Sequence, residues 1–224
     1  MPDTSKPVVV FGQSDFASLA WHVLTHDTPL TVAAFTVDGA YLGADHFCGL
    51  PVTAFETLQD RFPPEEFQML VPLGGRGANG FRRDRYLQAK ARGYEFATYV
   101  SSRALVAPGV PIGENCMIFE GAAVQAMASI GDNCIVRTLA NVSHHVSVGD
   151  HGFIAASAVI GGGATIGERC FLGLGAVVRD GVTVAERCLI GAGAVVTRDT
   201  DPNGVYTGVP AKRGPRLADE LDNV

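Results

Sequence analysis

Two adjacent histidines, His144 and His145, are the residues of this chain whose type and placement best suit acid–base chemistry. An imidazole exchanges a proton near neutral pH, so one of the two could serve as a general base. Gly162 lies eighteen residues further on, and Gly163 follows it. A glycine there would let a ligand approach the backbone and would offer an N–H group to an oxyanion. From spacing alone, the alternative is a pair of surface histidines with no chemical role.

A six-residue repeat from Val106 to Asp201 must position these residues. The first residue of all sixteen hexads is aliphatic, and the fifth is small. This period predicts a parallel β-helix in which each hexad forms one face of a triangular coil. A motif of aliphatic residue, glycine and acidic residue recurs every eighteen residues, as in Ile112-Gly113-Glu114 and Ile130-Gly131-Asp132. Three hexads therefore make one coil, and the second-position glycine suits a tight turn.

Four of the five cysteines occupy fifth positions of hexads: Cys116, Cys134, Cys170 and Cys188. Their separations are multiples of eighteen residues, which predicts that they stack along one edge of the prism. A buried thiol packs as a small hydrophobic group. We therefore expect a packing role for these cysteines and neither disulfides nor metal ligation.

The first hundred residues lack the hexad and alternate between strand and helix patterns. Strands are predicted over residues 7–11, 30–37, 50–53, 68–73 and 95–100, and helices over 16–24, 54–62 and 81–92. This order predicts a small, Rossmann-like α/β domain that binds ligands at the carboxyl ends of its strands. Arg82, Arg83 and Arg85 suggest a solvated face of the last helix. The expected division is residues 1–100 for this domain, 101–213 for the β-helix and 214–224 for an acidic tail.

Two loops of the first domain follow strands, precede helices and could hold phosphates. They are Gly12-Gln13-Ser14-Asp15 and Gly74-Gly75-Arg76-Gly77. The free N–H groups of a helix N-terminus favour anions, and Arg76 adds a cation. Neither loop matches the dinucleotide fingerprint or the P-loop, so ordinary strand-to-helix turns are the alternative.

Composition narrows the class of partner. The chain has 224 residues, 47% of them hydrophobic, and a formal net charge of −6. A negative chain without a long basic run argues against duplex nucleic acid as a partner. No apolar run reaches membrane-spanning length and the N-terminus lacks a signal-peptide pattern, so we expect a cytoplasmic protein.

Two motifs near the C-terminus carry a family resemblance: Leu-Ile-Gly-Ala-Gly-Ala-Val-Val over residues 189–196, and Gly-Val-Pro-Ala-Lys over residues 208–212. With the α/β domain before the hexads, the chain resembles the hexapeptide-repeat sugar acyltransferases. The similar group is the sialic-acid O-acetyltransferase-like one, which includes nucleotide-amino-sugar N-acetyltransferases. The resemblance, and not the periodicity, implies that the β-helix is left-handed. It also implies a homotrimer that binds acyl-CoA, most simply acetyl-CoA, between neighbouring prisms.

The resemblance also implies roles for individual residues. His144 would be the base that takes a proton from the amine or hydroxyl of a nucleotide-linked sugar, and the Gly162 N–H would steady the oxyanion. The CoA site would include Gly162, Gly163, Asp180, Ala192 and Lys212, and the sugar-nucleotide site Gly12, Gln13, Ser14 and Arg76. No metal is implied.

Two departures from the family pattern concern this site. The family usually has an acidic residue directly after the base, whereas this chain has His145, which leaves the group that orients the base unnamed. Arg137 stands where the family often has asparagine, seven residues before the base, and is a further candidate substrate ligand.

Two other classes of protein stay open at this stage. A trimeric metalloenzyme of the γ-carbonic-anhydrase kind would place His144, His145 and His151 around zinc. However, His145 and His151 share one position in successive hexads and are expected to point apart. The other alternative is a non-catalytic β-helix scaffold or sugar-binding protein.

Overall fold

The N-terminal part contains a five-stranded sheet. The computed structural model describes residues 6–220. Its sheet has the order β3-β4-β2-β1-β5, with β3 antiparallel to β4 and the other pairs parallel. The strands are β1 (Val8–Phe11), β2 (Val32–Val37), β3 (His46–Phe47), β4 (Leu50–Ala54) and β5 (Gln68–Leu70). The helices are α1 (Asp15–Asp27), α2 (Gly80–Ala91) and the 3-10 turns η1 (Gly39–Tyr41) and η2 (Phe55–Asp60).

The last strand expected for this domain belongs largely to the second part of the molecule. Phe96 makes an isolated bridge to Met69 of β5. The following strand, β6 (Tyr99–Val100), pairs with β8 (Met117–Ile118) in the β-helix. The segment over residues 95–100 therefore crosses from one part to the other, because its two ends find different sheet edges.

The strands between residues 99 and 196 are each two residues long and pair in parallel with the strand eighteen residues away, as in Asn141↔Val159. With two longer strands that follow residue 203, they form three sheets of eight, six and four strands. The eight-stranded sheet contains β6, β8, β11 (Ile135–Val136), β14 (Phe153–Ile154), β17 (Phe171–Leu172), β20 (Leu189–Ile190), β22 (Gly204–Thr207) and the antiparallel β23 (Lys212–Leu217). The six-stranded sheet contains β7 (Leu105–Val106), β9 (Ala123–Val124), β12 (Asn141–Val142), β15 (Val159–Ile160), β18 (Val177–Val178) and β21 (Val195–Val196). The four-stranded sheet contains β10 (Ser129–Ile130), β13 (Ser147–Val148), β16 (Thr165–Ile166) and β19 (Thr183–Val184).

The prism interior confirms the hexad pattern. The aliphatic first positions and small fifth positions from residue 116 to 196 form one continuous buried cluster. Cys116, Cys134, Cys170 and Cys188 are buried within it and unpaired, as predicted. The Cys134 N–H donates to Cys116 Sγ at 3.4 Å, which shows how the thiols stack between coils. The eighteen-residue register and this filling fit a left-handed β-helix.

The glycines at the second hexad position serve packing between coils and not the turn. Positive φ angles fall two residues later, at Asn115, Asn133 and His151, among others. A Cβ on Gly131 would lie 2.3 Å from Asp150 Oδ1 and 2.9 Å from its amide nitrogen. The expectation of a turn role was therefore wrong: these glycines let the next coil stack closely.

The three faces of the prism differ in chemistry. The eight-stranded face carries aromatic residues that the N-terminal part covers: Phe16 of α1 lies against Phe119 and Phe153. The four-stranded face carries Ser and Thr. The six-stranded face and its two corners expose the larger apolar side chains Leu105, Leu139, Leu174, Met127 and Val159. Among the described residues, the six-stranded face and its corners therefore form the most apolar exposed side of the prism.

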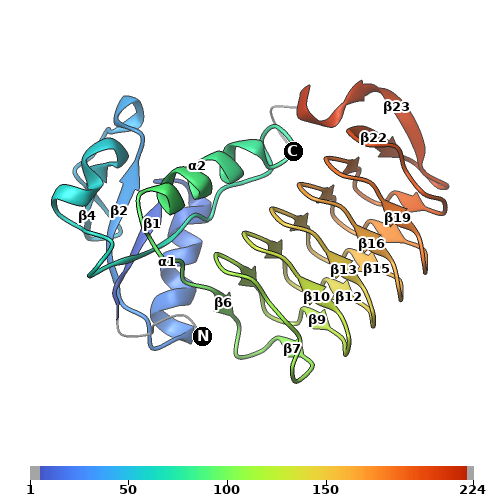
Figure 1. The fold of residues 1–224 in the computed structure, drawn as a ribbon, viewed down its shortest axis with the longest axis horizontal. Coiled ribbons are helices and arrows are strands. Elements are labelled where there is room, and N and C mark those ends of the chain that lie inside the picture. The colour runs from blue at the N-terminus through green and yellow to red at the C-terminus, as the bar shows by residue number, and fades with distance from the viewer. Residues whose placement is uncertain (1–5, 221–224) are drawn as a thin grey trace.

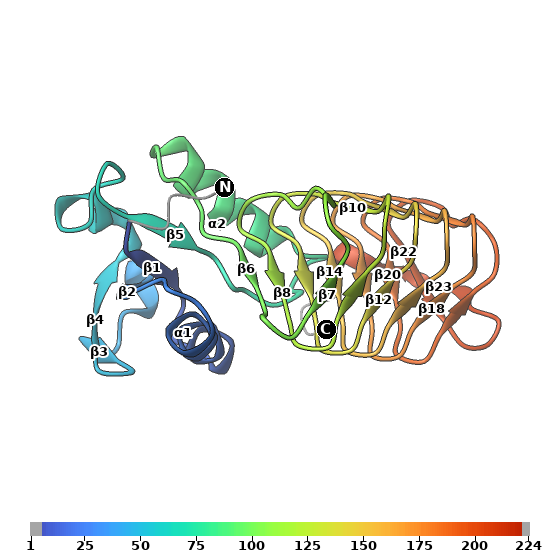
Figure 2. The same ribbon diagram turned by 90° about the horizontal axis from the view of Figure 1, so that it is seen from below.

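Helix α2 lies between the N-terminal sheet and the coils, as Figure 1 shows, and Figure 2 shows the coils stacked along the long axis. Arg82 of this helix is fully buried and donates to the carbonyl oxygens of His151, at 2.7 Å, and Gly152, at 3.0 Å. Burial lowers the pKa of Arg82 to about 10, so its guanidinium stays charged at neutral pH. The expected solvated face was wrong for Arg82, because α2 docks against the coils along that side.

The C-terminal segment is partly structured. Residues 212–217 form β23, and the short helix η3 (Ala218–Glu220) follows. The rest of the expected acidic tail, residues 221–224, lies outside the described residues. Over residues 6–220, no helix is both long enough and apolar enough to cross a membrane.

Candidate active site

The adjacent histidines lie at the corner between the six- and four-stranded sheets, which we call the histidine corner (residues 143–146 and the equivalent turns 161–164, 179–182 and 197–200). The Nδ1 atoms of His144 and His145 lie 3.1 Å apart, with the ring planes at 84°. For this contact to be a hydrogen bond, one nitrogen must carry hydrogen and the other must accept it. The His144 amide also donates to Gln125 Oε1 at 3.1 Å. Both residues are exposed, and the hydrogen bonds described for His144 involve its amide, its carbonyl and Nδ1 but not Nε2.

Gly162 lies directly against the His144 ring. A Cβ there would lie 2.5 Å from His144 Cε1 and 2.7 Å from Nε2. The Gly162 N–H donates to Asp180 Oδ1 at 2.7 Å, and the Gly163 N–H donates to the His144 carbonyl at 2.9 Å. The expected oxyanion role of the Gly162 N–H does not fit this geometry, because a carboxylate already accepts from it. Glycine is required here instead to make room for the imidazole.

His144, Gly162, Asp180 and Arg198 occupy the same position in successive coils and form one column along the histidine corner. Neighbouring strands are spaced by roughly 4.8 Å, so the column from His144 to Arg198 is about 14 Å long. Arg198 was not among the predicted ligands. The hexad register could have identified it, because position 198 lies three coils after position 144.

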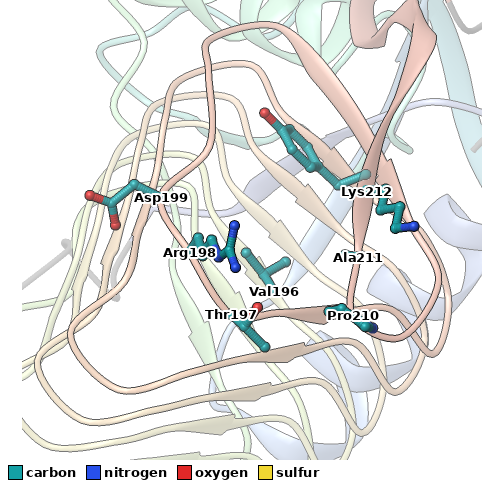
Figure 3. Close-up of a pocket in the computed structure, with 8 residues that line it drawn as sticks. Val196, Thr197, Arg198, Asp199, Pro210, Ala211 and Lys212 are labelled. Atoms are coloured by element: carbon teal, nitrogen blue, oxygen red, sulfur yellow. The ribbon is translucent and has the colours of Figure 1, made fainter.

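The far end of this column opens on a pocket of about 310 Å³. Figure 3 shows this pocket, with Arg198 from the histidine corner and Lys212 from β23 among its residues. The other lining residues are Val196, Thr197, Asp199, Tyr206, Pro210 and Ala211. The pocket therefore combines two cations and the carboxylate of Asp199 with an apolar wall that includes the buried Val196 and Tyr206. It contains Lys212, which is one of the predicted CoA ligands. Ala192, which is also a predicted CoA ligand, lies on the corner between the eight- and six-stranded sheets and is not part of this column.

A second pocket, of about 300 Å³, lies at the carboxyl ends of β1 and β2. It brings together the predicted residues Gly12, Gln13, Ser14 and Arg76; the other lining residues are Phe11, Val37, Asp38, Tyr41, Leu73 and Phe81. Ser14 is the N-cap residue of α1, and its side chain makes no capping hydrogen bond.

Of two charged residues considered for this second pocket, Asp38 lines it and Arg137 does not. The guanidinium of Arg137 lies over the rings of Phe119, at 4.2 Å, and Phe16, at 5.1 Å. The prediction of Arg137 as a substrate ligand finds no support in this position. Asp38 lines the pocket and pairs with Arg85 at 2.8 Å.

The three histidines of the metalloenzyme alternative do not meet. His151 lies on the corner between the four- and eight-stranded sheets, where its Nδ1 contacts Asn133 Nδ2 at 2.9 Å. Burial and the nearby Arg82 lower the pKa of His151 to about 4. Across residues 6–220, no three His, Cys, Asp or Glu side chains are grouped as metal ligands.

Comparison with known proteins agrees with the repeat fold. The family model for the hexapeptide repeat of succinyl-transferase matches residues 163–198. No curated protein sequence matches the chain.

Solved structures are similar over nearly the whole chain. PerB from Caulobacter crescentus, in complex with CoA and GDP-perosamine, is 30% identical with a TM-score of 0.84, covering 93% of this chain and 97% of its own. The acetyltransferase domain of PglB from Neisseria gonorrhoeae is 27% identical with a TM-score of 0.83, covering 93% and 99%. The same domain has been solved with acetyl coenzyme A. WeeI from Acinetobacter baumannii, at 19% identity and a TM-score of 0.73, shares the fold.

The fold and these similarities thus define an acyltransferase built on hexapeptide repeats. The chain belongs to the hexapeptide-repeat sugar acetyltransferases.

Proposed function

We propose that this enzyme transfers an acetyl group from acetyl-CoA to an amino group of a nucleotide-linked sugar. The observation that carries the proposal is the column that joins His144 to the pocket of Arg198 and Lys212. One end offers a general base with its Nε2 accessible, and the other offers cations for phosphates. Structurally similar enzymes have been solved with CoA and GDP-perosamine, which supports both substrate classes. Both are cytoplasmic metabolites, so we place the enzyme in the cytoplasm.

In this proposal acetyl-CoA lies along the histidine corner. Its phosphates bind near Arg198 and Lys212, and its extended pantetheine arm runs past Asp180 and Gly162 to bring the thioester to His144. The distance of about 14 Å along the column, given by the spacing of parallel strands, suits an arm of that kind.

Replacing Arg198 with Met should therefore weaken acetyl-CoA binding. A lost hydrogen bond to a phosphate costs about 1.5 kcal/mol, so we expect the KM for acetyl-CoA to rise about tenfold, with kcat changed less than about twofold. Arg216→Met, on the exposed end of β23, is the matched control and should leave the KM unchanged. Equal KM values for the two variants would remove Arg198 from the CoA site.

The proposed reaction uses the Nε2 atom of His144 as the proton acceptor. As the sugar amine attacks the thioester carbonyl carbon, the His144 Nε2 accepts a proton from that amine. The carbon–sulfur bond then breaks, and the leaving thiolate takes the proton back from the imidazolium. The new amide and free CoA account for all atoms, and no covalent enzyme intermediate is required.

His145 is the group that we propose orients His144 in place of the family's acidic residue. A base that reacts at Nε2 must carry its hydrogen on Nδ1, and the only side-chain partner described for the His144 Nδ1 is His145 Nδ1 at 3.1 Å. His145 would then be neutral, with its own hydrogen on Nε2. The contact therefore fixes both the tautomer and the ring orientation of the base.

Two variants at His145 test this role without straining the backbone, because Gly and Asn both tolerate its φ of +59°. His145→Asn keeps an acceptor near the Nδ1 position and should retain kcat within about threefold. His145→Gly removes the acceptor and should lower kcat about tenfold, the equivalent of one hydrogen bond, with the KM for acetyl-CoA unchanged. If the Gly and Asn variants had the same kcat, the positioning role would be wrong.

The nucleotide part of the acceptor is proposed to bind in the pocket of Gly12, Gln13, Ser14 and Arg76. There the start of α1 offers N–H groups, and Arg76 offers a cation.

A second copy of the chain is proposed to complete the site. In one chain the N-terminal part packs on the eight-stranded face and on the corner that contains His151, and the contacts described for the histidine corner stay within the coils. The exposed apolar six-stranded face is adjacent to the histidine corner. A homotrimer that buries this face would bring the nucleotide pocket of one chain to the base of another.

The experiment that tests the function is free-thiol release from acetyl-CoA with a panel of GDP-, UDP- and dTDP-linked amino sugars, and with the matching hydroxy sugars. Turnover with one amino sugar, and none with its hydroxyl counterpart, is the expected result. Turnover with only hydroxy sugars would overturn N-acylation. Acetyl-CoA binding without turnover on any nucleotide-linked acceptor would contradict the acceptor class, and no acetyl-CoA binding would favour a scaffold protein.

A further inference from the structure

The loop before α2 has an unusual backbone. Gly77, Ala78 and Asn79 have φ angles of +60°, +47° and +59°, so three consecutive residues are left-handed. Residues with a side chain rarely adopt this region, and consecutive ones do so only when their surroundings hold them there. Ala78 is fully buried in a small cluster with Leu189 and Val205, so its conformation cannot relax into solvent.

The β-helix holds this turn by direct hydrogen bonds. Arg169, on the coil corner, donates from Nε to the Ala78 carbonyl at 3.2 Å and from a terminal nitrogen to the Gly77 carbonyl at 3.1 Å. Asn79 returns a bond from its side chain to the Cys170 carbonyl at 2.9 Å. The guanidinium also lies over Gly80, where a Cβ would be 2.9 Å from it. Arg169 therefore contacts each of the two carbonyls that a relaxed loop would reorient.

Arg76 immediately precedes this turn and lines the N-terminal pocket. We propose that Arg169 is a positioning residue for the acceptor site: it locks the left-handed turn from the β-helix side and so sets where Arg76 meets the diphosphate of the nucleotide-linked substrate. This inference rests on the proposed function, because it assumes that this pocket binds the nucleotide. It makes nucleotide affinity depend on a coil residue that does not line the pocket.

The corner supplies a matched control. Arg187 occupies the same hexad position one coil further on, with the same left-handed backbone (φ of +59°), but its side chain pairs with Glu186 and approaches Asp219. Arg169→Met and Arg187→Met thus remove the same group from equivalent places, and only the first removes the bonds to the loop.

The test measures binding of GDP and of UDP by calorimetry for the full-length wild type, Arg169→Met, Arg187→Met, Arg76→Met and the Arg76/Arg169 double variant. For whichever diphosphate binds the wild type, we expect Arg169→Met to raise the Kd about tenfold and Arg187→Met to change it less than twofold. The double variant should be no weaker than Arg76→Met alone, because both substitutions disable the same contact. The Kd for acetyl-CoA should stay within twofold in every variant, which also shows that the proteins are folded.

Other outcomes separate this inference from the proposed function. If Arg76→Met weakens the diphosphate while Arg169→Met does not, the pocket is right and the positioning role is wrong. Additive effects in the double variant would show that Arg169 acts by a route other than Arg76. If the wild type binds neither GDP nor UDP, the pocket assignment itself fails, and this inference fails with it. If Arg169→Met does not fold, Arg169→Lys replaces it in the test. A lysine can donate to one of the two carbonyls but not to both, so its Kd should lie between that of the wild type and the tenfold higher value.

Discussion

Replacing His144 with Ala should lower kcat about a thousandfold, in the middle of the range for the loss of a general base. The imidazole is exposed and lies against Gly162, and His145 is the titratable side chain described in contact with it. The KM for acetyl-CoA should hardly change, because the proposed phosphate contacts are three coils away. Thiol release at saturating acceptor measures the effect, with His46→Ala, an exposed histidine of β3, as control.

The same variant tests whether the site lies between chains. The Arg76→Met enzyme should be slow because its nucleotide pocket is damaged, and the His144→Ala enzyme should be slow because it lacks the base. If one chain supplies the pocket and another supplies the base, co-expressed mixed oligomers should recover about one quarter of wild-type sites (one half times one half). No recovery in mixed oligomers would place both parts of the site in one chain. Full activity of His144→Ala by itself would show that the base is misassigned.

Replacing Arg82 with Met should be the most destabilising substitution outside the prism core. The Met side chain fills similar space but cannot donate. The buried carbonyls of Asn133 and His151 and the half-buried carbonyl of Leu73 therefore lose the hydrogen bonds that Arg82 gives them. Each buried acceptor that loses a charged donor is costly, so the free energy of unfolding should fall by about 3 kcal/mol.

Urea denaturation followed by circular dichroism measures this loss. Arg83→Met, at the next residue on the same helix, is the control: its side chain is half-exposed and pairs with the exposed carboxylates of Asp84 and Glu168, so its effect should stay within about 0.5 kcal/mol. A loss for Arg82→Met as small as that for Arg83→Met would show that α2 does not depend on this guanidinium for docking.

The sequence by itself determined the β-helix and the level at which its residues lie. A period of six with an aliphatic first residue can be satisfied only if every hexad turns the same side inward, which fixes the register of all coils. The burial of the four stacked cysteines follows from this register, and so does the column from His144 through Gly162 to Asp180. The same arithmetic places Arg198 in that column. Its place in a pocket was missed because only the fold of β22 and β23 beside it creates that pocket.

Only the tertiary structure decided which side chains form hydrogen bonds with one another and which charged residue is buried. The Gly162 N–H donates to the Asp180 carboxylate, and the Nδ1 atom of His144 contacts the Nδ1 atom of His145. Neither contact follows from the spacing of the residues, because both depend on side-chain directions at a corner. Arg82 looks like a surface residue beside its neighbours in the sequence, since a charged run on a helix is ordinarily solvated. It is buried only because α2 packs against the coils. There, backbone carbonyls from residues far along the chain accept the hydrogen bonds that water would otherwise accept from the guanidinium.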